Sequence, residues 1–135
     1  MKYFLWCFLF CFFHVFPAFL AAEEELSQKA IEEQRLDTIR YGTETEITAL
    51  IRTLKDEKAY YLNDELVQIV ETTRNRNILT GVFSFFGEQN KTGLEKRAIR
   101  AIEERDNEAN ETVSAAINYL GTLKAPEGKA PLETL

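Results

Sequence analysis

Apolar residues recur along this chain at the spacing of an α-helix, and this pattern limits the fold more than any other feature of the sequence. Ile47, Leu50, Ile51 and Leu54 fall at positions i, i+3, i+4 and i+7. Four more stripes of this kind follow between Leu62 and Leu120. Each stripe covers about a third of a helix surface, which is what burial on one side requires. No stretch shows the sustained alternation typical of a β-strand. The sequence therefore predicts an all-α fold.

The stripes and the signals at their ends predict seven helices joined by short links. Short links favour antiparallel neighbours, so consecutive helices are expected to form hairpins. The predicted ranges are 24–41, 44–56, 60–73, 76–87, 93–105, 110–122 and 127–135.

Polar residues and glycines at the predicted helix ends suggest specific caps. Thr43 with Glu46, and Thr92 with Glu95, fit the capping box. Asn63 and Asn110 are each followed by an acidic residue and are expected to be N-caps. Three glycines each follow a bulky apolar residue, as a left-handed C-cap requires, namely Gly42, Gly87 and Gly121.

The first 22 residues differ in composition from the rest of the chain. One basic residue, Lys2, precedes an apolar run from Tyr3 to Phe16, and small residues then lead to the acidic stretch at 23–25. This layout is typical of a secretory signal, so residues 1–22 are predicted to be a signal peptide and 23–135 the exported domain, periplasmic or secreted. Cleavage after Ala22 would leave Leu20 at the −3 position, where a small residue is preferred. The alternative is a membrane anchor formed by residues 3–22, at the short end for a span.

Composition after residue 22 excludes several kinds of chemistry. Both cysteines, the single histidine and the single tryptophan lie within residues 1–22. The remaining 113 residues therefore lack the groups for Cys or Ser–His catalysis and for a His/Cys zinc site. They carry 15 Lys or Arg against 22 Asp or Glu, a formal charge of −7, which argues against nucleic acid as a partner. No phosphate-binding glycine loop is present. We expect no catalytic residue, no metal and no cofactor.

Two further features of residues 23–135 leave alternatives open. Asn90-Lys91-Thr92 and Asn110-Glu111-Thr112 would be glycan acceptors in a eukaryotic secretory protein, whereas both also fit helix caps. The aromatic cluster around Phe83 and Phe86 fits a buried stripe, but Phe85 lies off that stripe. It would either fill a gap between helices or be exposed. One ring of Tyr60 and Tyr61 is expected to reach the surface.

The chain also repeats itself with an offset of 34 residues. When Gly87 is aligned with Gly121, Leu79 matches Val113, and the match continues through Phe86 and Leu120. At this point the chain resembles HEAT repeats. The segments that carry the resemblance are VSAAINYLGTLKAPEGKAPLETL (113–135), the more divergent ILTGVFSFFGEQNKTGLEKRAIRAIEER (78–105) and the weaker RLDTIRYGTETEITALIRTL (35–54). The Asp and Arg often found in the turn and second helix of that family have no clear match. The resemblance implies antiparallel helical hairpins stacked as a short α-solenoid.

The predicted last helix, 127–135, bears Leu132 and Leu135 and is only about two turns long. A terminal unit of a repeat stack needs a polar cap or a partner. We expect either a further repeat segment of a longer solenoid or another chain to dock on this helix.

The resemblance implies a non-enzymatic, exported scaffold or adaptor that binds another protein. If the second helix of each hairpin lines the concave side, the expected contact residues are Arg52, Lys55, Arg97 and Arg100. Pairing of these cations with nearby acids such as Glu103 and Glu104 is the alternative. A membrane-anchored structural subunit that retains the N-terminal helix is the second functional hypothesis. A HEAT-like lyase or chaperone is the third, and only the fold supports it.

Overall fold

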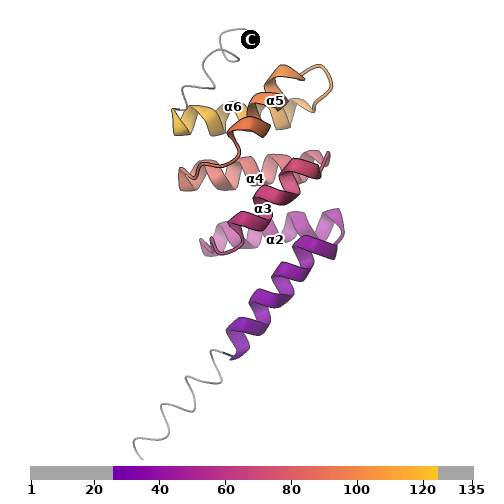
Figure 1. Ribbon diagram of the computed structural model, residues 1–135, viewed down its shortest axis with the longest axis vertical. Coiled ribbons are helices and arrows are strands. Elements are labelled where there is room, and N and C mark those ends of the chain that lie inside the picture. Colours follow the sequence, from indigo (N-terminus) through magenta and orange to yellow (C-terminus); the bar gives the residue numbers. More distant parts are fainter. Residues whose placement is uncertain (1–25, 125–135) are drawn as a thin grey trace, which may run out of the picture. The chain divides into compact units, whose positions relative to one another are not determined.

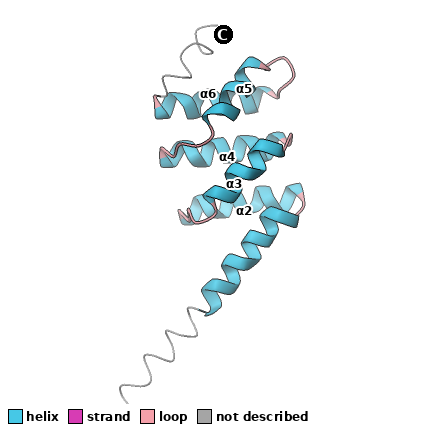
Figure 2. Ribbon diagram, in the orientation of Figure 1, coloured by secondary structure: helices cyan, strands magenta, loops and turns pink. Residues whose placement is uncertain are grey.

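The computed structural model describes residues 26–124, and every regular element in that range is a helix (Figures 1 and 2). The all-α prediction is confirmed for these residues. A helix at 26–41 precedes α2 (Glu44–Glu57), α3 (Asn63–Thr72), α4 (Arg76–Gln89), α5 (Glu95–Glu103) and α6 (Asn110–Leu123). The predicted signal at 1–22 and the predicted helix at 127–135 lie outside the described residues.

The chain divides into two units, Met1–Arg35 and Leu36–Leu135. The described part of the first unit, residues 26–35, is helical, with Gln28 donating a hydrogen bond to Glu32 at 3.3 Å. The second unit contains the core and the grooves described below.

Within the second unit, α4 packs between α2 and α6, and α5 packs against α6 (Figure 1). This packing differs from the sequence-based prediction, in which the helices at 44–54 and 93–105 are both the second helix of a hairpin. In the structure α2 packs against α4, and α4 packs against α6. The helices α3 and α5 begin 32 positions apart, at Asn63 and Glu95, and each follows a buried leucine, Leu62 or Leu94.

The predicted apolar stripes form the core. All four members of the α2 stripe are buried, and so are Phe83 and Phe86 of α4. Phe85, left open by the sequence, is only 1% exposed; its ring lies 5.8 Å from that of Tyr60 and meets Phe86 edge-on at 6.1 Å. Burying one such side chain contributes about 1.5–3 kcal/mol, so this aromatic cluster is a main source of stability.

One predicted N-cap is confirmed, and three are wrong. Thr43 and Glu46 form the complete capping box at the start of α2. Asn63 and Asn110 instead occupy the first helical positions of α3 and α6, after Leu62 and Ala109. Thr92 does not cap α5, whose N-cap is Leu94; Glu95 accepts a hydrogen bond from the Gly93 amide instead.

The side chain of Asn63 makes a long-range contact instead of a cap. Its side-chain amide donates a hydrogen bond of 3.0 Å to the side chain of Gln89 at the end of α4. The sequence missed Asn75, which does cap α4 by accepting from the amides of Asn77 and Ile78.

The glycine C-caps are also corrected. Gly87 and Gly121 lie inside α4 and α6, two residues before each helix ends. The left-handed caps are Lys58, Asn90 and Lys124, with φ between 51° and 54°. Gly42 does follow the end of the 26–41 helix, but among described glycines only Gly93 has a positive φ. Asn90 and Lys124 are 34 positions apart, the same separation as Gly87 and Gly121. The spacing of the two caps therefore agrees with the prediction, although the capping residues do not.

Candidate functional site

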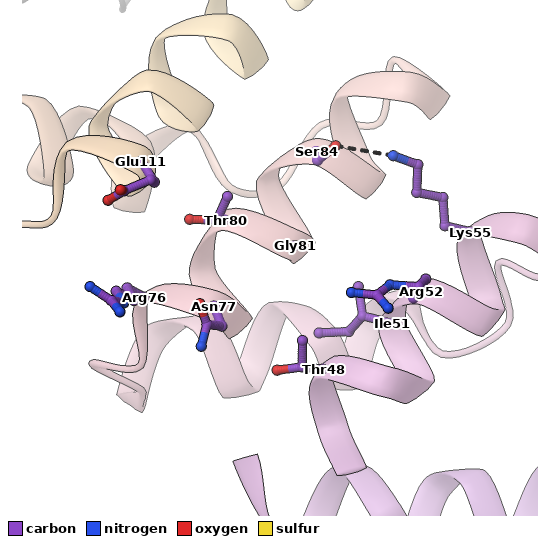
Figure 3. A pocket seen from close by; sticks show the side chains of 10 residues that line it. All are labelled: Thr48, Ile51, Arg52, Lys55, Arg76, Asn77, Thr80, Gly81, Ser84 and Glu111. Carbon is purple, nitrogen blue, oxygen red and sulfur yellow. Dashed lines mark hydrogen bonds between the residues drawn. The ribbon is translucent and has the colours of Figure 1, made fainter. Parts of the chain in front are cut away.

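An open groove of about 600 Å³ lies on the outer side of α2 and α4 and reaches the start of α6 (Figure 3). We call it the basic groove. Its lining comes from three helices: Thr48, Ile51, Arg52 and Lys55 of α2; Arg76, Asn77, Thr80, Gly81 and Ser84 of α4; and Glu111 of α6.

Helical periodicity explains which side chains reach the groove. On α2, Thr48, Arg52 and Lys55 are spaced i, i+4 and i+7, so they share one face of the helix, beside the buried stripe whose member Ile51 also lines the groove. On α4, small residues line the groove where α2 approaches. At Gly81 a Cβ atom would lie 3.3 Å from Cγ2 of Ile51, so α2 packs close to α4 at the groove floor.

Three cations and one carboxylate line the basic groove, although the whole chain carries a formal charge of −6. Lys55 donates to Ser84 at 3.4 Å and forms an ion pair of 2.7 Å with Glu88. That pair is solvent-exposed, and such pairs are weak because water screens both charges. Arg52 and Arg76 form no ion pair within residues 26–124. The groove therefore offers cations that a ligand can neutralise.

A second hollow of about 620 Å³ adjoins the basic groove across α4 and α6. The two hollows share Thr80, Ser84 and Glu111. The second hollow also contains Ser114, Asn118 and Thr122, which follow one another along α6. We call the two hollows together the α2–α4–α6 groove.

The structure separates the four predicted contact residues into two pairs. Arg52 and Lys55 both line the basic groove. Arg97 and Arg100 lie on α5 and line a different, strongly polar hollow of about 510 Å³. The prediction that all four share one surface assumed that their two helices occupy equivalent places in two hairpins. In the structure, α2 and α5 line different hollows.

Arg97 and Arg100 also differ from each other. Arg97 is only 5% exposed and forms a 2.7 Å ion pair with Glu108, while its Nη1 atom is buried without a partner. Arg100 is about half exposed and lies 3.7 Å from Glu71 of α3. Neither cation pairs as the i, i+3 or i+4 spacing on its own helix suggested. Arg97 mainly holds the loop after α5 in place, and Arg100 is the more accessible of the two.

Sequence reasoning missed Arg76, the third cation of the basic groove. It lies at the first position of α4, and nothing in its local sequence connects it with Arg52. Only the packing of α4 against α2 brings the two into one groove.

The α4–α5 connection, beside the second hollow, is held by Tyr119. Its hydroxyl donates to the Lys91 carbonyl oxygen at 3.0 Å and accepts from the Leu94 amide at 3.2 Å. Burial raises the pKa of Tyr119 to about 12. Its ring also stacks 6.0 Å from Phe83. The contact joins α6 to the loop between α4 and α5.

The described residues contain no group of three or more acidic, histidine or cysteine side chains suited to hold a metal ion. Among residues 26–124, no helix is long and apolar enough to cross a membrane. Both sequon asparagines, Asn90 and Asn110, are exposed, whereas Thr112 of the second sequon is fully buried.

Comparison with known proteins finds no matching family model, no matching curated protein and no matching solved structure.

Proposed function

We propose that this protein is a non-enzymatic, exported scaffold of HEAT-like helical hairpins that binds another protein through the α2–α4–α6 groove. The basic groove is the observation that carries the proposal. It presents Arg52 and Arg76 without ion-pair partners in the described chain, on the surface of an acidic protein. A cationic groove of this kind is complementary to an acidic partner.

The spacing of the helices supports the repeat architecture in this proposal. α4 begins at Arg76 and α6 at Asn110, 34 positions later, and α4 packs directly against α6. α2 packs on the other side of α4 and begins 32 positions before it. Repeat units that contact their neighbours in this way create extended surfaces suited to protein binding.

Affinity capture with charge-reversal variants tests the scaffold function. The full chain is immobilised and exposed to extract of its source cells, and bound proteins are quantified by mass spectrometry. Arg52→Glu with Arg76→Glu is expected to lose a specific partner. Lys96→Glu with Arg105→Glu is the matched control, because both residues are exposed, lie outside the groove and change the charge equally. If both double variants capture the same proteins as the unmodified chain, the proposal is wrong.

The α5 pair remains a second predicted contact site. Arg100→Glu tests it without breaking the buried ion pair of Arg97. Loss of partner capture in this variant would extend the binding surface to α5. Unchanged capture would remove Arg100 from the contact residues.

Export and the alternative of a membrane anchor rest on residues 1–22. The intact mass of the native protein distinguishes them, since a mass equal to residues 23–135 indicates a cleaved signal and no glycan. A retained segment together with resistance to a carbonate wash would instead support the membrane-anchored subunit. Glycans on Asn90 or Asn110 would add a mass that enzymatic deglycosylation removes.

A further inference from the structure

The two hollows of the α2–α4–α6 groove differ in chemistry. Two cations of the basic groove, Arg52 on α2 and Arg76 at the start of α4, have no ion-pair partner in the described chain and can therefore bind an anion (Figure 3). Lys55 adds a third positive charge, which Glu88 partly neutralises through an ion pair of 2.7 Å. A ligand carboxylate could replace Glu88 here, because the pair is exposed to water and weakly held.

The second hollow carries neutral hydrogen-bonding groups together with two carboxylates, Glu88 and Glu111. Ser114, Asn118 and Thr122 lie along α6, and Asn90 lies at the end of α4. The side chain of Asn118 has both a donor and an acceptor and no hydrogen-bond partner in the described chain. Such a group can bind the N–H and C=O of a peptide backbone at the same time.

The groove lacks the feature that a helical ligand would need. A helix bound in a groove is held by apolar side chains, because its backbone groups are already hydrogen-bonded internally. The large apolar residues that line the two hollows, Ile51, Phe83 and Tyr119, are each 3% exposed or less. The groove therefore has no large apolar side chain that a ligand can reach, which favours a ligand with unpaired backbone groups.

We propose that the α2–α4–α6 groove binds an acidic protein segment in an extended conformation, with its carboxylates at Arg52 and Arg76 and its backbone across Asn118. This inference rests on the proposed scaffold function and specifies its ligand. The chain's overall negative charge disfavours nucleic acid as the occupant, since long-range repulsion opposes a polyanion that extends beyond the groove.

Fluorescence anisotropy with a synthetic peptide tests the charge requirement. The probe is a labelled ten-residue peptide of alternating Glu and Ser, and the matched control contains Gln in place of Glu. The full chain is expected to bind the Glu peptide at least about tenfold more tightly, which corresponds to about 1.4 kcal/mol. The preference should weaken as salt is added. Equal affinity for both peptides would overturn the inference.

Variants of the protein test where the peptide lies. Arg52→Glu with Arg76→Glu should weaken binding of the Glu peptide by about tenfold or more, whereas Lys96→Glu with Arg105→Glu should leave it unchanged. Asn118→Ala should weaken binding severalfold without altering its salt dependence. A peptide methylated on its backbone nitrogens should also bind more weakly if the backbone crosses Asn118. Unchanged affinity in the arginine variant, or in both backbone tests, would contradict the proposed position.

Failure of this inference can be distinguished from failure of the scaffold proposal. If the arginine variant loses its cellular partner but the Glu peptide never binds, the scaffold proposal stands and the extended acidic ligand is wrong. If a short DNA oligonucleotide competes as well as the Glu peptide, the site is a general polyanion site and the peptide assignment fails. Circular dichroism confirms that each variant remains helical.

Discussion

The phenolic oxygen of Tyr119 on α6 lies 3.0 Å from the carbonyl oxygen of Lys91, and it also accepts a hydrogen bond from the amide of Leu94. One side chain therefore satisfies two main-chain groups of the loop that joins α4 to α5. Leu94 is completely buried, so its amide is expected to have no access to water if Tyr119 is removed. The relationship links three helices through a single hydroxyl.

Replacing Tyr119 with phenylalanine should lower the free energy of unfolding by about 1–3 kcal/mol, because buried main-chain groups lose their partner. Urea denaturation of the variant and the unmodified chain measures the difference. Tyr41→Phe is the matched control, since the Tyr41 ring is 82% exposed and its change should have little effect. Equal destabilisation by both changes would show that the hydroxyl contact is unimportant.

The raised pKa of Tyr119 predicts a loss of stability at high pH. Burial favours the neutral phenol in the folded state and raises its pKa to about 12, above the ordinary value of 10.0. Its contribution is therefore complete below the unfolded pKa and falls as pH rises through the folded pKa. Unfolding measured between these two pH values should show the loss, and Tyr119→Phe should show a smaller dependence on pH. A steeper dependence in the variant would refute this assignment.

Glu108 is expected to stabilise the fold through its ion pair with the buried Arg97. Glu108→Ala leaves that guanidinium without its carboxylate, and removal of one partner of a buried pair costs about 3 kcal/mol. Glu71→Ala is the control, because Glu71 pairs with Arg100 in water at 3.7 Å and should contribute about 0–1 kcal/mol. Thermal or urea unfolding of the two variants measures the contrast, and a larger effect of Glu71→Ala would contradict the burial argument.

Asn75, rather than Asn110, should be important for helix capping. Its side chain accepts from two amides at the start of α4, so Asn75→Ala should cost about 1 kcal/mol. Asn110 occupies a helical position with no side-chain cap, and Asn110→Ala should change stability by only a few tenths of a kcal/mol. Chemical denaturation distinguishes the two, and the sequence-based capping prediction would be restored if Asn110→Ala were the more damaging.

Two helical glycines should respond differently to alanine. Apart from its chain neighbours and the adjoining backbone of α6, no atom lies within 4 Å of the position that a Cβ would take at Gly121, so Gly121→Ala should stabilise α6 by about 0.5–1 kcal/mol. At Gly81 the same atom would lie 3.3 Å from Ile51, and crowding should offset most of that gain. Melting temperatures of the two variants provide the comparison. An equal gain at both positions would mean that α2 and α4 are not tightly packed at Gly81.

Much of the helical content could be predicted from residues close together in sequence. The apolar stripe of α2 and the contact between Thr43 and Glu46 both depend on groups within a few positions of each other. The same local reasoning failed for Asn63, whose amide reaches Gln89, 26 residues away. It also failed for Thr92, because Leu94 is the residue buried at the start of α5.

The sequence predicted only part of the basic groove, for a similar reason. Arg52 and Lys55 share a face of one helix, so helical spacing alone placed them together. Arg76 lies in the same groove because α4 packs against α2. Arg97 is buried and pairs with Glu108, eleven residues further along the chain. Neither outcome is encoded by local spacing.

The sequence by itself determined that residues 26–124 form helices joined by short links, and approximately where each helix begins and ends, since helix periodicity and capping act over one or two turns. The tertiary structure decided that α4 packs against both α2 and α6, which cations face one groove and which asparagine serves as a cap. These choices depend on the joint burial of several helices, and burial free energy depends on area removed from water rather than on the order of residues along the chain.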